Sequence, residues 1–498
     1  MRAPTLFTVV MALSSPPVFA ATFIVTHTGS TGPGSLRAMI EAANQTNGAH
    51  TIRFDLAANS TIALTATLPE ITATTVIVNG ANVPGLVIDA WEGSAFRVGE
   101  TNSSFILSNL TVKRGWRSNG GGCLRADSAL SSNATVVVTN VKLQGCGALP
   151  ATAQSPVQGG AIHVVDRAVL IQDSVIEDSA TRHVAWTLPL TLTAQGAALF
   201  MSSVSAKTLT INNSRFAANH ASADDVSRGG AIFATGPITV TIADSVFAGN
   251  QAVAEVEATG GAIQVEGGAN IMVENSLFFE NHADHAATLL ADPGTAARIL
   301  RLRNNTFVGN FGGGTVTSRY NQLEIRNNSF ADSIPINPGG VQHLDLRGIT
   351  PSSPLTIDFS NNLLLPLVSG NDLLCAVTGS AATVNASHNL MAGLGQLCGP
   401  HQTAPAQTVR VEALRENGGP TPTLSLRAGS SAIDAGNPAA PSVPATAPCL
   451  TLDARGVSRP QDGDASGDAR CDVGAWESEG EAPLFRDDLE PVLWRPAN

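Results

Sequence analysis

The sequence is short of charge, of tyrosine and of long apolar runs. Only 14% of its 498 residues are Asp, Glu, Lys or Arg, and a single Tyr is present. Long surface helices need charged outer faces, so this composition disfavours a helical protein and suits short strands and tight turns rich in Gly. After residue 20 no apolar run is long enough to span a bilayer as a helix.

Positive charge is scarcer than negative charge. Lys and Arg total 28 against 40 acidic residues, which gives a net charge of −12. This balance argues against nucleic acid and against an anionic membrane surface, because both are bound through Lys and Arg. No GxSxG, P-loop, HExxH or CxxC segment occurs either.

Residues 1–20 have the pattern of a secretory signal peptide. Arg2 supplies the positive charge, Leu6 to Leu13 form the apolar stretch, and Val18-Phe19-Ala20 resembles a cleavage site. An exported protein meets an oxidising compartment, where its six cysteines can form disulfides. The cysteines fall into three local pairs separated by 23, 23 and 22 residues, which predicts sequential pairing: Cys123 with Cys146, Cys375 with Cys398, and Cys449 with Cys471.

A repeated sequence motif dominates the middle of the chain. GGAI begins at Gly229 and again at Gly260, 31 residues later, and each copy continues through a β-branched run to an Asn or Asp, a Phe and a further Asn. A fixed period of this length is typical of a solenoid, in which each rung buries its apolar face against its neighbours. Helical periodicity is absent, so the rungs are expected to consist of short parallel strands.

Stacking assigns a role to each repeated residue type. The Gly pair before Ala231 and Ala262 is expected to let the backbone turn tightly with positive φ. A column of Asn and Asp is expected in left-handed turns, bonded from rung to rung, and a column of Phe is expected inside. The first column comprises Asn213, Asp244, Asn275, Asn304 and Asn327, and the second Phe216, Phe247, Phe278, Phe307 and Phe330.

The ends of the solenoid differ from its middle in composition and in predicted secondary structure. Ser35 is a suitable N-cap for a helix through Ala43 that would cover the first rung. Proline and Asp-Gly turns dominate beyond residue 400. We therefore divide the chain into a signal peptide (1–20), an N-terminal cap (21–50), a solenoid (51–400), a C-terminal module (401–478) and a tail (479–498).

Several motifs carry a family resemblance. The GGAI and FxxN pairs resemble the repeats of chlamydial polymorphic outer-membrane proteins and of other bacterial right-handed parallel β-helix proteins. The segments GGPTPTLSLRAGSSAIDAG, DARGVSRP and CDVGAWE resemble the choice-of-anchor Q domain that ends many such chains. This resemblance implies an all-β, right-handed parallel β-helix of the pectin lyase-like fold, secreted or held at the outer surface of a bacterium.

Candidate catalytic residues are few. Asp224, Asp225 and Arg228 lie in a corner loop before a GGAI, where a groove could form, and a solvated loop is the alternative. His220 and His282 share a repeat position, with His285 close by, but Ala252 is expected to interrupt that column. No convergent catalytic cluster is evident, so no catalytic residue is assigned.

One loop has the spacing of a calcium site. Asp462, Asp464 and Asp468 match the first half of a calcium-binding loop, but Val473 stands where the bidentate Glu is needed. An Asp-Gly turn closed by the Cys449–Cys471 bridge is the alternative interpretation, and no other cofactor is indicated.

The sequence therefore favours a non-enzymatic exported β-helix protein that adheres to or binds a polysaccharide or cell-surface glycan. A polysaccharide lyase or glycoside hydrolase is the first alternative, because the same fold hosts such enzymes. A structural surface protein is the second.

Overall fold

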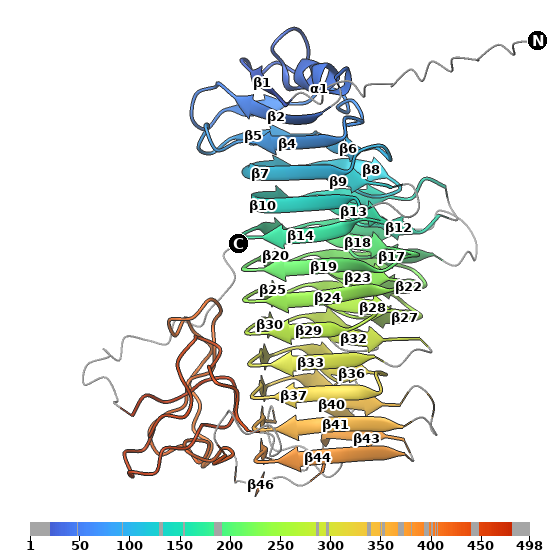
Figure 1. The fold of residues 1–498 in the computed structure, drawn as a ribbon. Helices are drawn as coiled ribbons and strands as arrows, with labels where there is room; N and C mark the ends of the chain where they lie inside the picture. Colours follow the sequence, from blue (N-terminus) through green and yellow to red (C-terminus); the bar gives the residue numbers. More distant parts are fainter. Residues whose placement is uncertain are drawn as a thin grey trace, which may run out of the picture.

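The computed structural model describes residues 20–480, except 47, 92, 129–132, 153–154, 184–191, 285–287, 295–297, 336–339, 349, 351–353, 367–372, 380, 393–397, 400–401, 404, 406 and 440–447. Nearly all of the predicted signal peptide and most of the predicted tail lie outside the described residues. Within them the chain is a stack of parallel strands, with helix α1 (Leu36–Asn44) over the first rung (Figure 1). No described helix is long and apolar enough to cross a membrane.

The predicted cap helix is confirmed. The hydroxyl of Ser35 accepts a hydrogen bond from the amide of Ala38 at 3.2 Å, which satisfies one of the free amides of the first turn. Leu36, Ile40 and Ala43 are buried against the solenoid core. The helix therefore covers apolar side chains that the first rung would otherwise expose.

One rung shows the path that the others repeat. The chain runs through β23 (Ile232–Thr235), β24 (Ile238–Ala243), β25 (Val246–Ala248), β26 (Gln251–Val253) and β27 (Glu257–Thr259). Corresponding strands of successive rungs pair in parallel and form four sheets, A to D. Strands β24 and β25 both belong to sheet A, which bends between them.

Sheet A contains two ladders of strands on either side of this bend. The first ladder comprises β1 (Ala21–Val25), β2 (Ala49–Phe54), β4 (Thr75–Asn79), β14 (Ala168–Gln172), β19 (Lys207–Asn212), β24, β29 (Ile271–Glu274), β33 (Ile299–Arg303), β37 (Gln322–Arg326), β41 (Leu355–Ser360) and β44 (Ala382–Ser387). The second comprises β3 (Thr61–Ala63), β5 (Val87–Asp89), β15 (Val175–Glu177), β20 (Arg215–Ala217), β25, β30 (Leu277–Phe279), β34 (Thr306–Val308), β38 (Ser329–Ala331), β42 (Leu363–Leu364), β45 (Leu390–Met391) and β46 (Gln402–Thr403). Strands β7 (Ser104–Lys113) and β10 (Thr135–Gln144) run through both ladders.

Sheets B, C and D complete the rungs. Sheet B comprises β6 (Phe96–Val98), β9 (Leu124–Ala126), β13 (Ile162–Val165), β18 (Leu199–Ser202), β23, β28 (Ile263–Glu266), β32 (Leu289–Asp292), β36 (Val316–Ser318), β40 (Val341–Arg347) and β43 (Leu373–Thr378). Sheet C comprises β8 (Trp116–Ser118), β11 (Gly147–Leu149), β16 (Ala180–His183), β21 (His220–Ala223), β26, β31 (His282–Ala283), β35 (Phe311–Gly312) and β39 (Ile334–Pro335). Sheet D comprises β12 (Val157–Gln158), β17 (Thr193–Gln195), β22 (Val226–Arg228) and β27.

The predicted columns at the bend of sheet A are present. Asn213, Asp244 and Asn275 have φ between 43° and 52°, and the Asn275 amide donates to the Asp244 carboxylate at 3.1 Å. Inside the bend, successive Phe rings stack with their centroids 4.7–5.0 Å apart, from Phe216 to Phe330. The Asn and Asp column lies on the outside of the bend and is called the outer column below.

Two further columns of polar residues lie inside the solenoid and were not predicted. One contains Asn219, Asn250, Asn281 and Asn310, and each of the first three amide groups donates to the next at 2.9–3.1 Å. The other begins with serines and continues through Asn305, Asn328, Asn362 and Asn389. These amides satisfy the backbone groups at the corners of the rungs, where no strand partner is available.

The two glycines of GGAI are required for different reasons. Positive φ was predicted for the pair, but only the first glycine adopts it, with φ of +66° at Gly229 and +64° at Gly260. The second glycine is needed for space, because a Cβ on Gly230 would overlap the Gly261 carbonyl oxygen and the backbone of Gln251 in sheet C. The backbone at Gly230 therefore lies too close to neighbouring backbone for any side chain to fit.

All three predicted disulfides are formed, with Cα atoms 5.7, 5.8 and 6.5 Å apart for Cys123–Cys146, Cys375–Cys398 and Cys449–Cys471. Cys146 precedes Gly147, whose strand register places Cys146 at the top of the column that contains Asn219. The first bridge thus closes the upper end of an inner polar column.

The C-terminal module packs against the outer face of the second ladder of sheet A (Figure 1). Its residues Val409, Leu414, Leu424 and Val473 join a core with outward-facing side chains of the solenoid. Those solenoid side chains are Leu277, Val308, Ala331, Leu363, Leu365 and Leu390. The outer column also binds the module: Asn327 accepts from the Leu450 amide at 3.1 Å, and Asn304 donates to the Leu452 carbonyl at 2.9 Å.

His343 gives the solenoid a predicted sensitivity to acid. The ring is fully buried in β40, and its Nε2 donates to the Leu365 carbonyl at 2.8 Å. Burial lowers the pKa of His343 from 6.5 to about 4. The unfolded chain therefore takes up the proton first as the pH falls. The contribution of His343 to stability, about 3 kcal/mol, is complete above pH 6.5 and is lost as the pH falls through 4.

We expect His343→Gln, which can still donate to Leu365, to lose less stability than the native protein between pH 7 and pH 4. Urea unfolding at several pH values measures the difference. Parallel pH profiles for the two proteins would contradict this assignment.

Candidate functional site

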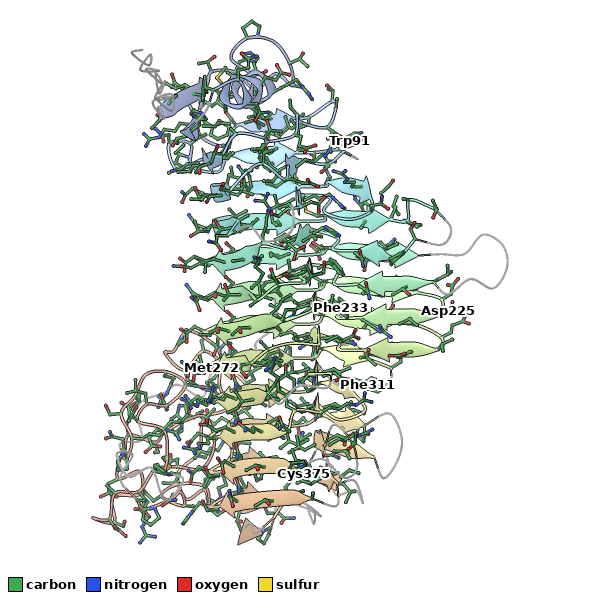
Figure 2. The ribbon with its side chains drawn as sticks, turned by 45° about the vertical axis from the view of Figure 1, so that its right-hand side comes forward. Trp91, Asp225, Phe233, Met272, Phe311 and Cys375 are labelled. Carbon is green, nitrogen blue, oxygen red and sulfur yellow. A yellow bond between two sulfur atoms is a disulfide. The ribbon has the colours of Figure 1, made fainter. Side chains whose placement is uncertain are left out.

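Sheets C and D form an arm beside the outer face of sheet B. Strands β21 and β22 lie on its two sides, joined at the tip by Asp224 and Asp225 (Figure 2). Small side chains fill the space between the sheets, which keeps the arm thin: Leu192, Ala194, Ala197, Ala221 and Ala223 in one cluster and Ala252, Ala254, Ala258 and Ala283 in another. Two separate hollows lie on the flank of sheet B beside the arm, one at the earlier and one at the later rungs, and this flank is called the groove below.

Alternate residues of sheet B face this groove. The strand register places Gln264 beside Leu290 and Glu266 beside Asp292 in the next rung. Further along, Thr317 pairs with Asp345. Upstream, the rings of His163, Phe200 and Phe233 stack at 5.0 and 5.8 Å along the same column, and all three are buried. The outward column of sheet B is thus polar in the later rungs, whereas its earlier part is aromatic and covered.

The lower hollow is the part of the groove formed by the later rungs. It has a volume of about 460 Å³. Its lining consists of Arg228, Glu257, Thr259, Gln264, Glu266, Leu290, Asp292, Gly313, Thr317, Arg319, Asp345 and Arg347. An upper hollow of about 390 Å³ lies at the earlier rungs, around Arg97, Arg117 and Arg125.

Ion pairs fix the charged groups of the lower hollow. Arg228 lies 3.4 Å from Glu266 and 3.6 Å from Glu257, and Arg319 lies 2.9 Å from Asp292. Asp345 is bonded to Arg347, and Gln264 donates to Glu266 at 2.7 Å. Each of the four carboxylates that line this hollow therefore has an Arg within 4.0 Å. Such an array offers many polar contacts to sugar hydroxyls, but no carboxyl group set apart from cations in apolar surroundings, where a general acid keeps its proton.

The structure separates the three candidate catalytic residues. Asp224 and Asp225 lie at the tip of the arm, where the Asp225 carboxylate accepts the Leu192 amide at 2.7 Å (Figure 2). Arg228 lies at the base of the arm and lines the lower hollow. Only Arg228 is thus placed where a ligand in the groove could reach it.

The column with His220 and His282 differs in one position from the prediction. The residue between them in sheet C is Gln251, not Ala252, which faces the interior of the arm. His282 is bonded to Asp284 at 2.8 Å, whereas His285 lies outside the described residues. His220, Gln251 and His282 each directly follow an Asn of the inner column, which fixes Gln251 at this position.

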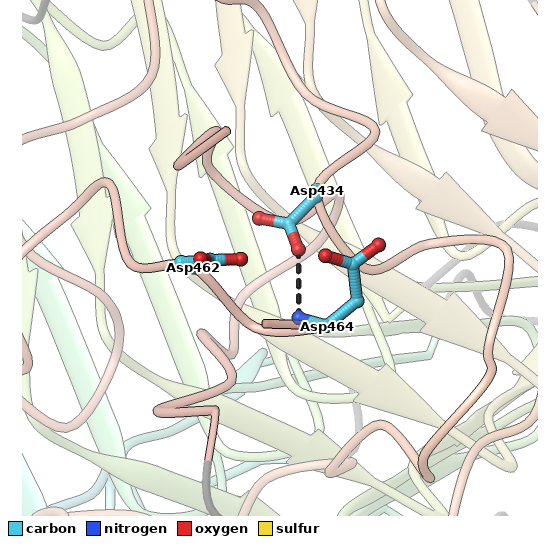
Figure 3. Close-up of side chains that lie close together, drawn as sticks. All are labelled: Asp434, Asp462 and Asp464. Atoms are coloured by element: carbon cyan, nitrogen blue, oxygen red, sulfur yellow. Dashed lines mark hydrogen bonds between the residues drawn. The ribbon is translucent and has the colours of Figure 1, made fainter. Parts of the chain in front are cut away.

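The candidate calcium loop brings together two of its three predicted aspartates. Asp462 and Asp464 have carboxylate oxygens within 4.8 Å of one another and of Asp434, which was not predicted (Figure 3). Asp468 instead pairs with Arg470 at 2.7 Å. Backbone amides already occupy the group, because Asp462 accepts from Ser466 and Gly467, both at 2.9 Å. These bonds account for the loop as an Asp-Gly turn, and calcium binding stays a prediction.

The specific motifs of the C-terminal module form a buried charge network. Arg459 and Glu477 are fully buried and lie 3.4 Å apart, and Arg455 is bonded to Asp453 at 2.8 Å. The carboxylates of Asp453 and Glu477 also accept backbone amides of Val457, Gln461 and Asp472 at 2.9 Å. Burial, together with the charge of Glu477, raises the pKa of Asp472 to about 8. The DARGVSRP and CDVGAWE segments are thus explained by folding of the module.

Comparison with known protein families supports the architecture. Residues 129–330 match the family model described as a right-handed β-helix region. The fold is a right-handed parallel β-helix. The match covers about two fifths of the chain and includes the clearest GGAI rungs. Among curated proteins, none matches the sequence.

Sequence reasoning missed most of the groove of the β-helix. Its residues come from several rungs and are far apart in the chain, so they form no local motif. A signal was nevertheless present in the repeat: GGAIFAT at Gly229 becomes GGAIQVE at Gly260, which exchanges Phe233 and Thr235 for Gln264 and Glu266. Polar residues at two alternate positions of one strand indicate an outward face that changes character.

Proposed function

We propose that this chain is an exported β-helix protein that binds a polysaccharide or cell-surface glycan in the groove along sheet B without cleaving it. The groove with its lower hollow carries the proposal. In the later rungs, which lie about 4.8 Å apart, Glu266 pairs with Asp292 and Thr317 with Asp345, so polar groups recur along the flank of sheet B as an elongated ligand of repeating units requires. The three disulfides and the N-terminal segment support export into an oxidising compartment.

The ion-paired carboxylates favour binding over cleavage. A glycoside hydrolase needs one carboxyl group that stays protonated and a second that acts as nucleophile or base. In the lower hollow Glu257, Glu266, Asp292 and Asp345 are all held by guanidinium groups. The groups are arranged to hold hydroxyls rather than to transfer a proton.

We expect Arg319→Ala and Asp345→Ala each to weaken glycan binding by about tenfold, because each removes a charged hydrogen-bonding group from the lower hollow. A glycan array with the purified protein identifies the ligand, and isothermal titration calorimetry measures its affinity. The exposed Arg53 on β2, outside the lining of both hollows, supplies the control, and Arg53→Gln should bind as the native protein does.

Two results would contradict the proposal. Release of reducing ends or of unsaturated products from the bound polysaccharide would establish a hydrolase or lyase. Absence of binding across the array would favour the structural surface protein.

A further inference from the structure

The upper hollow differs from the lower one in having an unpaired cation. Three guanidinium groups converge there from β6, β8 and β9: those of Arg97, Arg117 and Arg125. Arg97 and Arg125 are direct partners in adjacent rungs of sheet B. Like charges in this position repel each other unless something neutralises them.

Two of the three cations have their own carboxylates. Arg97 is bonded to Glu70 at 2.8 Å, and the Nε of Arg125 is bonded to Asp127 at 2.7 Å. Arg125 also donates to the backbone carbonyl of Asn119. These bonds fix two sides of the upper hollow, and the second oxygen of Asp127 lies 3.5 Å from His163 Nδ1.

Arg117 has no such partner. In the part of the chain that the structure describes, its guanidinium forms no hydrogen bond and no ion pair within 4.0 Å, and its Nη1 is buried. Burial, and then the charges of Arg97 and Arg125, lower the pKa of Arg117. A buried N–H donor without an acceptor costs free energy, and a charged donor costs more.

We propose that the upper hollow binds an oxyanion carried by a sugar ring, a carboxylate or a sulfate, with Arg117 as its principal contact. The planar guanidinium fork matches both groups and forms paired, charge-assisted hydrogen bonds with them. The ligand would satisfy the buried Nη1 and reduce the repulsion among the three Arg side chains. Glu100 also borders the hollow, but its exposed side chain can turn toward water.

The lower hollow is not suited to the same ligand. Its three Arg side chains are all paired, and it has four carboxylates, so an anion would have to break an existing ion pair. The acidic unit of a glycan is therefore assigned to the upper hollow, and its neutral units to the rest of the groove. This assignment rests on the proposed function, because it names the class of glycan that the groove selects.

The test compares polymers that differ in charge. Polygalacturonate, dextran sulfate and neutral dextran are titrated against the native protein, Arg117→Gln, Arg117→Lys and the control Arg53→Gln. We expect at least one anionic polymer to bind about tenfold more tightly than dextran, and Arg117→Gln to abolish that preference while Arg117→Lys retains part of it. Equal affinity for charged and neutral polymers, or a preference that survives Arg117→Gln as it survives Arg53→Gln, would overturn the inference.

A second measurement separates failure of this inference from failure of the proposed function. Monomeric galacturonate and inorganic sulfate are added to the native protein and to Arg117→Gln, and the melting temperature is followed. If no polymer binds but either anion stabilises only the native protein, the glycan-binding function fails and the oxyanion site stands. If neither anion stabilises the native protein more than the variant, the oxyanion site fails as well.

Discussion

Replacing Asn250 by alanine is expected to lower the free energy of unfolding by about 4 kcal/mol. Its amide is fully buried, accepts the backbone and side-chain amides of Asn219 at 3.2 and 2.9 Å, and donates to the Phe216 carbonyl at 2.9 Å. Alanine would leave polar groups of two rungs without partners and would open a cavity in the column. Urea unfolding followed by circular dichroism measures the change.

Asn213→Ala is the matched control, because Asn213 lies in the outer column with its side chain at the surface. Its amide donates to Asp173 at an exposed position, where water can replace the bond. We expect a loss of about 1 kcal/mol or less, part of it from the positive φ of 43° that Asn tolerates better than Ala. If the two variants were equally destabilised, the inner column would not have the role assigned to it.

Arg459→Ala is expected to destabilise the C-terminal module by about 4 kcal/mol, because it leaves the buried carboxylate of Glu477 without its cation. Arg459 also donates to the Gly474 carbonyl at 2.9 Å, next to the Gly474 amide that bonds to Asn361 of the solenoid. Loosening the module should uncover the apolar side chains of β30 and β42. Limited proteolysis and binding of a hydrophobic dye measure both effects.

The stability defect of Arg459→Ala is also expected to depend on pH. Because the pKa of Asp472 is raised to about 8, the folded module holds a proton there that the unfolded chain releases near pH 4. The stability that Asp472 contributes is therefore complete below pH 4 and is lost as the pH rises through 8. The defect of Arg459→Ala should grow from pH 6 to pH 9, when Asp472 and Glu477 are both ionised.

Arg427→Ala provides the comparison for Arg459→Ala. Its side chain is 61% exposed and lies 3.7 Å from Glu412, so its removal should change the stability by less than about 0.5 kcal/mol. Similar proteolysis of the two variants would show that the buried network does not hold the module.

The fold could be predicted because its determinants repeat. Gly229, Asp244 and Phe247 recur at a fixed period, and the same backbone conformation and ring stack recur with them. The inner Asn250 column follows the same period, but its side chains point inward at a corner, and one sequence does not reveal that direction.

The groove could not be predicted for a different reason. Glu266, Asp292 and Arg319 become neighbours only when the register of three rungs is known, and the connecting loops differ in length. Asp224 and Asp225 were predicted as candidates because they lie in a corner loop before a GGAI, yet the chain carries them to the tip of the arm. Proximity along the chain and proximity across rungs are separate properties in a solenoid.

The outer face of the second ladder of sheet A changes from polar to apolar along its length. Gln144 and Glu177 occupy one outward column in the earlier rungs, and Phe279, Val308 and Ala331 occupy it in the later ones, where they pack against the module. A ribosome makes this later strip well before it makes Val473, which helps to cover it. A chain interrupted in between carries a complete solenoid with an adhesive flank, and such products aggregate. The C-terminal module thus protects the apolar flank of the solenoid that is synthesised before it.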